Sequence, residues 1–141
     1  MTEEEFETIL VEDETINDSD KTHVVPAGHG HKIRSILVEY TTSGDAGNRV
    51  LWCEILDALG DVIWHERSLP TIAATLTRFY VFQPEVIWAQ AGTFDTGGCI
   101  RLPFPNILLR AGWQVRIYDS AAIAVGADDM IIHMLVRDYV I

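Results

Sequence analysis

The chain has no run of about 18 apolar residues, the length that a transmembrane helix needs. Residues 31–141 contain no stretch that keeps an amphipathic helical period, and positions 1–20 contain no Lys or Arg. The N-terminal sequence MTEEEFETIL lacks the basic region and apolar core of a signal peptide. We therefore expect a chain that is not exported by that route and has no membrane partner.

The charge is distributed unevenly along the 141 residues. The formal net charge is -11, but nine of the 21 acidic residues lie in positions 1–20. The remaining residues carry 12 acidic and 10 basic side chains and are nearly neutral. Phosphate backbones require clustered Lys and Arg, so nucleic acid is not an expected partner. The pattern predicts an acidic N-terminal arm at 1–21 and one domain at 22–141.

The arm has two interpretations. Thr2 and Glu5 form a weak capping box, and the apolar residues that follow share one helical face, which is typical of a short helix. The charge density instead favours a solvated tail. If the arm docks, we expect the site to lie on another subunit. The candidate interface residues of the arm are Phe6, Ile9, Leu10 and Val11.

From His31 onward, short apolar segments alternate with turns rich in Gly, Asp, Asn and Pro. Turn signals recur at roughly 8–12-residue intervals, which is typical of a β-sandwich. We predict an all-β fold, a single jelly roll of about eight antiparallel strands, with an immunoglobulin-like sandwich as the alternative. The expected strands lie in segments 22–25, 31–43, 49–57, 62–66, 75–83, 86–92, 97–104, 106–119 and 129–141.

Several of these segments are apolar on both faces. In segment 31–43, Ile36 and Val38 share one face while Ile33 and Leu37 add apolar surface off it. Hydrophobic residues make up 48% of the chain, which is rich for a soluble monomer and indicates faces that contact other subunits. His133, inside the last apolar segment, is expected to be such an interface residue.

Tryptophan and cysteine add two further expectations. Trp52 and Trp64 lie in a predicted hairpin and are expected to form a cross-strand pair, either in the core or as a binding platform. Cys53 and Cys99 are interpreted as two buried thiols of the core.

Residues that could carry chemistry are few. No G-x-S-x-G elbow is present and neither cysteine has a base in a recognisable motif, so no enzymatic activity is expected. His23, His29 and His31 suggest a metal site of the cupin type, because His29 and His31 form a His-x-His pair near a glycine. No third ligand for this pair is evident from the sequence. We therefore predict no metal and no cofactor. Asp128 and Asp129 are interpreted as capping the last strand rather than binding calcium.

The passages ILVEYTTSGDAGNRVLWCEILDALGDVIW and LPFPNILLRAGWQVRIYDSAAIAVGADDMIIHMLV carry a resemblance that covers most of residues 30–137. They resemble the capsid cement or decoration proteins of tailed bacteriophages, of jelly-roll type. The resemblance implies a virion protein, made in the host cytoplasm, that binds the capsid exterior as a homodimer or homotrimer. It implies that the major capsid protein is the partner and supplies no catalytic residues. Alternatives are a neck, tail or fibre module, and a cupin-like or sugar-binding jelly roll.

Overall fold

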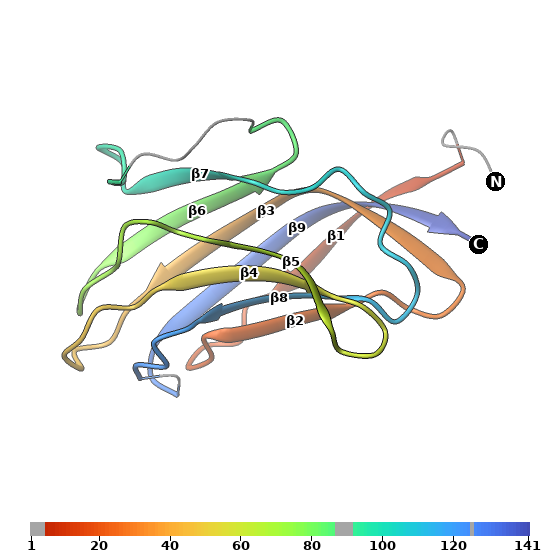
Figure 1. Ribbon diagram of the computed structural model, residues 1–141. Coiled ribbons are helices and arrows are strands. Elements are labelled where there is room, and N and C mark those ends of the chain that lie inside the picture. Colours follow the sequence, from red (N-terminus) through yellow and green to blue (C-terminus); the bar gives the residue numbers. More distant parts are fainter. Residues whose placement is uncertain (1–4, 87–91, 125) are drawn as a thin grey trace.

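The computed structural model describes residues 5–86, 92–124 and 126–141. Two β-sheets pack face to face, which confirms the expected all-β sandwich (Figure 1). The secondary structure of the described residues consists of nine strands. No helical segment among them has the length and apolarity needed to cross a bilayer.

The larger sheet contains five strands in the spatial order β1-β9-β3-β6-β7. Their bounds are β1 Glu7–Asp13, β3 His29–Thr41, β6 Thr77–Gln83, β7 Cys99–Pro103 and β9 Asp129–Val140. The smaller sheet contains four strands in the order β2-β8-β4-β5. Their bounds are β2 Asp20–Val24, β4 Leu51–Leu56, β5 Val62–Arg67 and β8 Gln114–Asp119.

The pairing of the strands is nested. β1 pairs with β9, β2 with β8, β3 with β6 and β4 with β5, each time antiparallel. β9 also pairs with β3, and β8 with β4. β7 departs from this scheme, because it pairs in parallel with β6 at the edge of the five-stranded sheet. The first four strands of the chain therefore pair with four later strands that follow in reverse order, namely β9, β8, β6 and β5.

The core lies between the two sheets and follows the two-residue period of the strands. Ile36, Val38 and Tyr40 of β3 face it from one sheet, and Val115 and Ile117 of β8 face it from the other. All five side chains are fully buried. The sequence pattern predicted these inward faces correctly, as it did the turn at Ala111 and Gly112 that precedes β8.

The N-terminal segment behaves differently from the expectation. Residues 7–13 form β1 along the edge of β9, and β2 begins at Asp20, so residues 5–21 are part of the sandwich. The predicted short helix is wrong for these residues. Ile9 and Val11 pack against the core while Leu10, between them, is exposed. This alternation has a period of two, and the free edge of β9 supplies the hydrogen-bonding partner that a strand requires.

The two tryptophans of the β4–β5 hairpin do not form the predicted cross-strand pair. The register places Trp52 opposite Arg67 and Trp64 opposite Ile55, so the two indoles lie on different faces of the sheet. Trp52 stacks on His65, with ring centroids 4.9 Å apart. Trp64 points inward and meets the Phe104 ring edge-on at 5.0 Å.

The expectation that both cysteines are buried in the core is confirmed for one of them. Cys53 is fully buried, as predicted, but Cys99 is only half-buried, because its neighbours Ile100 and Leu102 occupy the inward positions of β7. Neither thiol is in a disulfide. The expected strand at 86–92 lies almost entirely outside the described residues.

Candidate functional site

The surface of the five-stranded sheet that faces away from the core is apolar at its centre. Leu10, Leu37 and Leu135 are 53%, 40% and 46% exposed there. The register brings these strands together: Leu10 lies opposite Leu135 across β1 and β9, and Leu37 lies opposite Val81 across β3 and β6. We call the patch formed by Leu10, Leu37, Phe79, Val81, Ile131 and Leu135 the outer apolar face.

This face exists because the central strands carry apolar side chains on both sides. The inner side is covered by the four-stranded sheet, whereas none of the described strands covers the outer side. A strand exposed on one side normally alternates apolar and polar residues. β3 and β9 depart from that alternation at Leu37 and Leu135, which is why the sequence suggested apolar contacts with another molecule.

Charged side chains border the outer apolar face on the β1 side. His133 Nε2 lies 2.8 Å from Glu14 Oε1, and Glu12 is directly opposite His133 in the ladder. The hydrogen bond with His133 lowers the pKa of Glu14. At the end of β1, the Arg137 guanidinium lies over the Phe6 ring, 4.6 Å from its centroid.

The residues predicted to form an interface are therefore divided among three places. Leu10 and His133 lie on or beside the outer apolar face, and Phe6 lies at the end of β1, where its ring packs 5.6 Å from that of Tyr139. Ile9 and Val11 pack inward, and Trp52 and Trp64 belong to the other sheet. Sequence reasoning did not single out Leu135. The sequence did carry a signal for it, because Leu135 is two residues after His133 and therefore lies on the same side of the strand.

The outer surface of the four-stranded sheet is mixed, because Val24 and Ile63 are 50% and 46% exposed there beside a group of charged residues. Arg116 bonds both carboxylate oxygens of Asp20, at 2.9 and 2.8 Å, and reaches Glu54 at 3.5 Å. Its guanidinium also lies 3.9 Å from the centroid of the Tyr118 ring. The ion pair with Asp20 raises the pKa of Arg116. These charged groups satisfy one another, and Arg116 on β8 and Glu54 on β4 lie between the edge strands that carry Val24 and Ile63.

A second group of residues lies at the end of the sandwich where β3 begins and β9 ends. His31 is buried and links the two sheets, because its Nδ1 lies 2.9 Å from His23 Nε2 on β2. Its Nε2 lies 3.0 Å from Asp138 Oδ1 on β9. His29 Nδ1 approaches the same carboxylate oxygen at 2.8 Å. We call His23, His29, His31 and Asp138 the histidine cluster.

The glycines of the GHGH segment position this cluster. Gly28 has a φ of 78°, a conformation that glycine adopts at low cost, and it makes the turn into β3. Gly30 lies beneath the Ile141 side chain, where a Cβ would come within 2.7 Å of Ile141 Cδ1. The two histidines that flank Gly30 point to the other side, toward Asp138.

Burial sets the charge state of the two linked imidazoles. Burial lowers the pKa of His23 to about 4, and the neighbouring His31 adds to this effect. Burial also lowers the pKa of His31, and it outweighs the opposing influence of Asp138. Both imidazoles are thus neutral at pH 7. A consistent set of tautomers has His23 donating to His31 and His31 donating to Asp138.

Comparison with known proteins adds no assignment: no protein-family model matches the chain, and no curated protein matches its sequence. The functional proposal therefore rests on the architecture of the protein itself. This architecture consists of a sandwich whose five-stranded sheet exposes leucines on its outer side, an acidic edge strand, and a cluster of histidines at one end.

Proposed function

We propose that this protein is a structural component of a virion that binds the outside of a tailed-phage capsid. There it cements neighbouring major capsid proteins and stabilises the shell. It acts as a homo-oligomer, is made in the host cytoplasm, and performs no enzymatic reaction. The observation that carries the proposal is the outer apolar face, a protein-binding surface on a chain whose sequence resembles capsid cement proteins.

The strand order supports a jelly roll as the finer fold assignment. A jelly roll is a long hairpin of eight strands wrapped into two four-stranded sheets. The nested pairs β1·β9, β2·β8, β3·β6 and β4·β5 have the connectivity of such a hairpin. In this assignment β1 is the first strand of the roll, and β7 is an addition inside the connection from β6 to β8.

The physical case for the outer apolar face rests on solvation. Three exposed leucines gather on adjacent strands of one surface, which they share with His133 and Glu39. Scattered apolar residues on a surface are ordinary, whereas a group of them is typical of a binding site. Burying an aliphatic side chain contributes roughly 1.5–3 kcal/mol. A flat sheet surface of this kind fits a flat partner such as the outside of a shell.

The charges beside this face indicate the chemistry of the partner. β1 is an edge strand that carries Glu7 and Glu12 in exposed positions, and Glu14 follows it. Such an edge resists pairing with another β-strand. We expect the shell surface to present an apolar patch bordered by Lys and Arg, which would complement this acidic border.

Weak contacts suffice for cementing because they are repeated. When an oligomer contacts several shell subunits at once, the second contact forms at a high effective concentration, and avidity exceeds the affinity of one contact by about 10²–10⁴-fold. The shell is then stabilised by mass action, since the protein binds only the assembled lattice.

Quantitative mass spectrometry of density-purified phage particles from the native source tests the proposal. A ratio near one copy of this chain for each major capsid protein, or a simple fraction of it, is the expected result. A few copies per hundred shell subunits would move the protein to the neck, tail or a fibre. Absence from particles would overturn the proposal and favour a ligand-binding jelly roll.

A variant pair tests the surface itself. Leu37→Ser and Leu135→Ser, combined, should lower occupancy on shells stripped of the protein by at least about tenfold, while the melting temperature changes little. Leu59→Ser is the matched control, because Leu59 is 88% exposed in the turn between β4 and β5. Equal occupancy of the control and the double variant would show that the outer apolar face does not bind the shell.

A further inference from the structure

The proposed structural role in a shell makes no use of the histidine cluster, which has the residue types of a metal site. We propose that His29, His31 and Asp138 bind one divalent transition-metal ion of the zinc type, with His23 positioning His31 from the other sheet. Imidazole nitrogens and a carboxylate oxygen are ligands that zinc prefers in proteins. The sequence hid this site because Asp138 is 107 residues away from His31 in the chain.

The geometry of the donor atoms fits such an ion. His29 Nδ1, His31 Nε2 and Asp138 Oδ1 all lie within 4.8 Å of one another, and the carboxylate oxygen is 2.8 and 3.0 Å from the two nitrogens. Ligands of a tetrahedral zinc ion with bonds of about 2.0–2.1 Å lie about 3.3 Å apart. The two nitrogen–oxygen pairs therefore need to separate by only a few tenths of an ångström to admit the ion.

His23 supplies the contact that a ligand histidine usually has at its second nitrogen. When His31 Nε2 binds the ion, the proton of His31 moves to Nδ1 and is donated to His23 Nε2. His23 then carries its own proton on Nδ1, so both imidazoles stay neutral and the number of protons is conserved. The two ring planes lie within 5° of each other, which suits this hydrogen bond in either direction.

The rigidity of the site comes from its setting. His31 is held by two backbone hydrogen bonds with Leu109 as well as by the β3·β9 ladder, in which it is paired with Asp138. Such support keeps ligands near their binding geometry before the ion arrives. His29 is more exposed and lines a surface hollow of about 460 Å³ together with Leu108, Arg110 and Ile141.

Metal titration of the full-length chain, produced without a histidine tag and treated with a chelator, tests this proposal. Calorimetry with Zn²⁺ should give one ion bound per chain, and Co²⁺ should develop the visible absorption of tetrahedral coordination. His29→Ala and Asp138→Asn should each weaken Zn²⁺ binding by at least about 100-fold, because each removes a ligand. His23→Leu should weaken it by about 10–100-fold, because it removes the positioning contact.

Two histidines provide matched controls. His65→Ala removes an exposed histidine on the other sheet, and His133→Ala removes the one that is grouped with Glu12 and Glu14 on the protein surface. Both variants should bind Zn²⁺ as the parent chain does. Thermal melting without metal verifies that each variant is folded, and His29→Ala is the safest in this respect because its side chain is 33% exposed.

Nitrogen-15 NMR of the imidazoles gives an independent readout. Adding Zn²⁺ should move the proton of His31 from Nε2 to Nδ1 and that of His23 from Nε2 to Nδ1. The proposal is overturned if the parent chain binds no Zn²⁺, if binding survives both His29→Ala and Asp138→Asn, or if only His133→Ala abolishes it. The metal titrations use the isolated chain, so their result is independent of whether the protein binds a capsid.

Discussion

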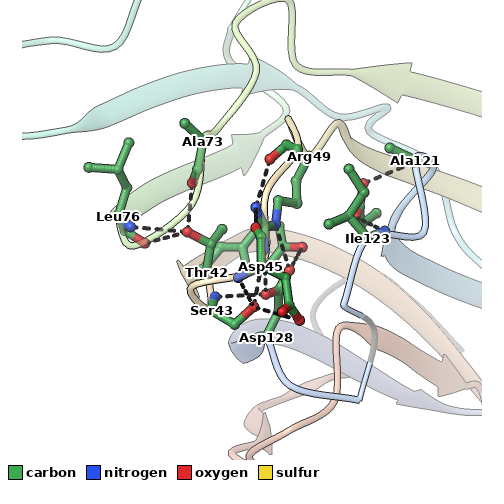
Figure 2. A network of polar contacts seen from close by, with 12 residues as sticks. Thr42, Ser43, Asp45, Arg49, Ala73, Leu76, Ala121, Ile123 and Asp128 are labelled. Carbon is green, nitrogen blue, oxygen red and sulfur yellow. Dashed lines mark hydrogen bonds and ion pairs between the residues drawn. The ribbon is translucent and has the colours of Figure 1, made fainter.

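A buried ion pair shows how single residues hold one end of the sandwich. The side chains of Arg49 and Asp128 are both fully buried and form two hydrogen bonds, from Nε at 2.9 Å and from Nη2 at 3.1 Å. The Ser43 backbone N–H also donates to Asp128 (Figure 2). The Tyr40 hydroxyl donates to the same carboxylate. The pair therefore fastens the loop between β3 and β4 to the start of β9.

Removing one partner of this pair should be costly. Arg49→Met leaves the Asp128 carboxylate buried without its counter-charge, which costs about 3–5 kcal/mol in comparable cases. Asp128→Asn leaves the Arg49 guanidinium buried without its counter-charge and should lower the unfolding free energy by about as much. Chemical denaturation with the linear extrapolation measures both. The double variant Arg49→Met, Asp128→Asn should be less destabilised than the two single losses added together, and simple additivity would contradict the ion pair as the cause.

The same pair makes a prediction about acid. Burial tends to raise the pKa of Asp128, but the hydrogen bonds from Arg49, Ser43 and Tyr40 outweigh it and hold the pKa below its ordinary value of 3.8. Because the folded pKa lies below the unfolded one, the contribution to stability is complete above about pH 4 and is lost as the pH falls through the folded pKa. Unfolding free energies measured between about pH 5 and 2 should fall more steeply for the parent chain than for Asp128→Asn.

Sequence alone could not predict that Arg49 pairs with Asp128, or that Asp138 joins His23, His29 and His31. Arg49 and Asp128 are 79 residues apart, and each reads locally as an ordinary turn residue. Asp128 was interpreted as a cap for the last strand, which describes its position but misses its partner. Residue types and local spacing indicate candidates, whereas the pairing of β3 with β9 decides which of them meet.

At the scale of elements, β1 is the segment that sequence reasoning assigned least well. Its acidic composition suggested a tail or a helix, yet Ile9 and Val11 contribute to the core from an edge strand. Strands with strong turn signals on both sides, such as β8 and β9, were placed correctly. The difference is physical, because an edge strand is stabilised by the neighbour it pairs with, and that neighbour is far away in the sequence.

β1 can be tested by comparing its two faces. Val11→Ser removes an inward contact and should lower the unfolding free energy by about 1–2 kcal/mol. Leu10→Ser changes the adjacent exposed residue and should stay within about 0.5 kcal/mol of the parent chain. Denaturant titration of both variants distinguishes the faces. Equal effects would mean that residues 7–13 do not hold the register with β9 in solution.

The hairpin of β4 and β5 illustrates a second limit at this scale. The two strands were predicted, but the pairing of Trp52 with Trp64 was not correct. The register shifts between Ile55 and Leu56, and a shift of one residue exchanges the faces of every side chain beyond it. A sequence shows that two tryptophans lie in adjacent strands, while the register decides whether they meet.

The whole molecule combines two polar clusters inside with two unequal surfaces outside. The histidine cluster and the Arg49–Asp128 pair lie at opposite ends of the β3·β9 ladder, since His31 is paired with Asp138 at one end and Thr41 with Asp129 at the other. Each cluster ties strands together where they leave the core. The body between them carries the outer apolar face, which we propose as the surface that binds a shell.

Charge determines how that surface should respond to salt. The net charge of -11 is concentrated near the N-terminus, and Glu12 of β1 and Glu14, which follows it, border the outer apolar face. If the shell carries complementary basic groups, raising NaCl from about 0.05 to 0.5 M shortens the screening length and should lower occupancy on stripped shells. An apolar contact alone would not weaken in this way.

The carboxylates of this border can be tested as the source of that salt dependence. Glu12→Gln combined with Glu14→Gln should reduce occupancy at low salt and flatten its dependence on NaCl, because two of the attracting charges are gone. Asp61→Asn is the control for charge, since Asp61 is an exposed acid in the turn between β4 and β5 of the other sheet. Sedimentation of shells after mixing, followed by quantification of bound chain, measures each curve. A control that flattens the curve as much as the double variant would show that net charge, rather than the acidic border of the outer apolar face, guides binding.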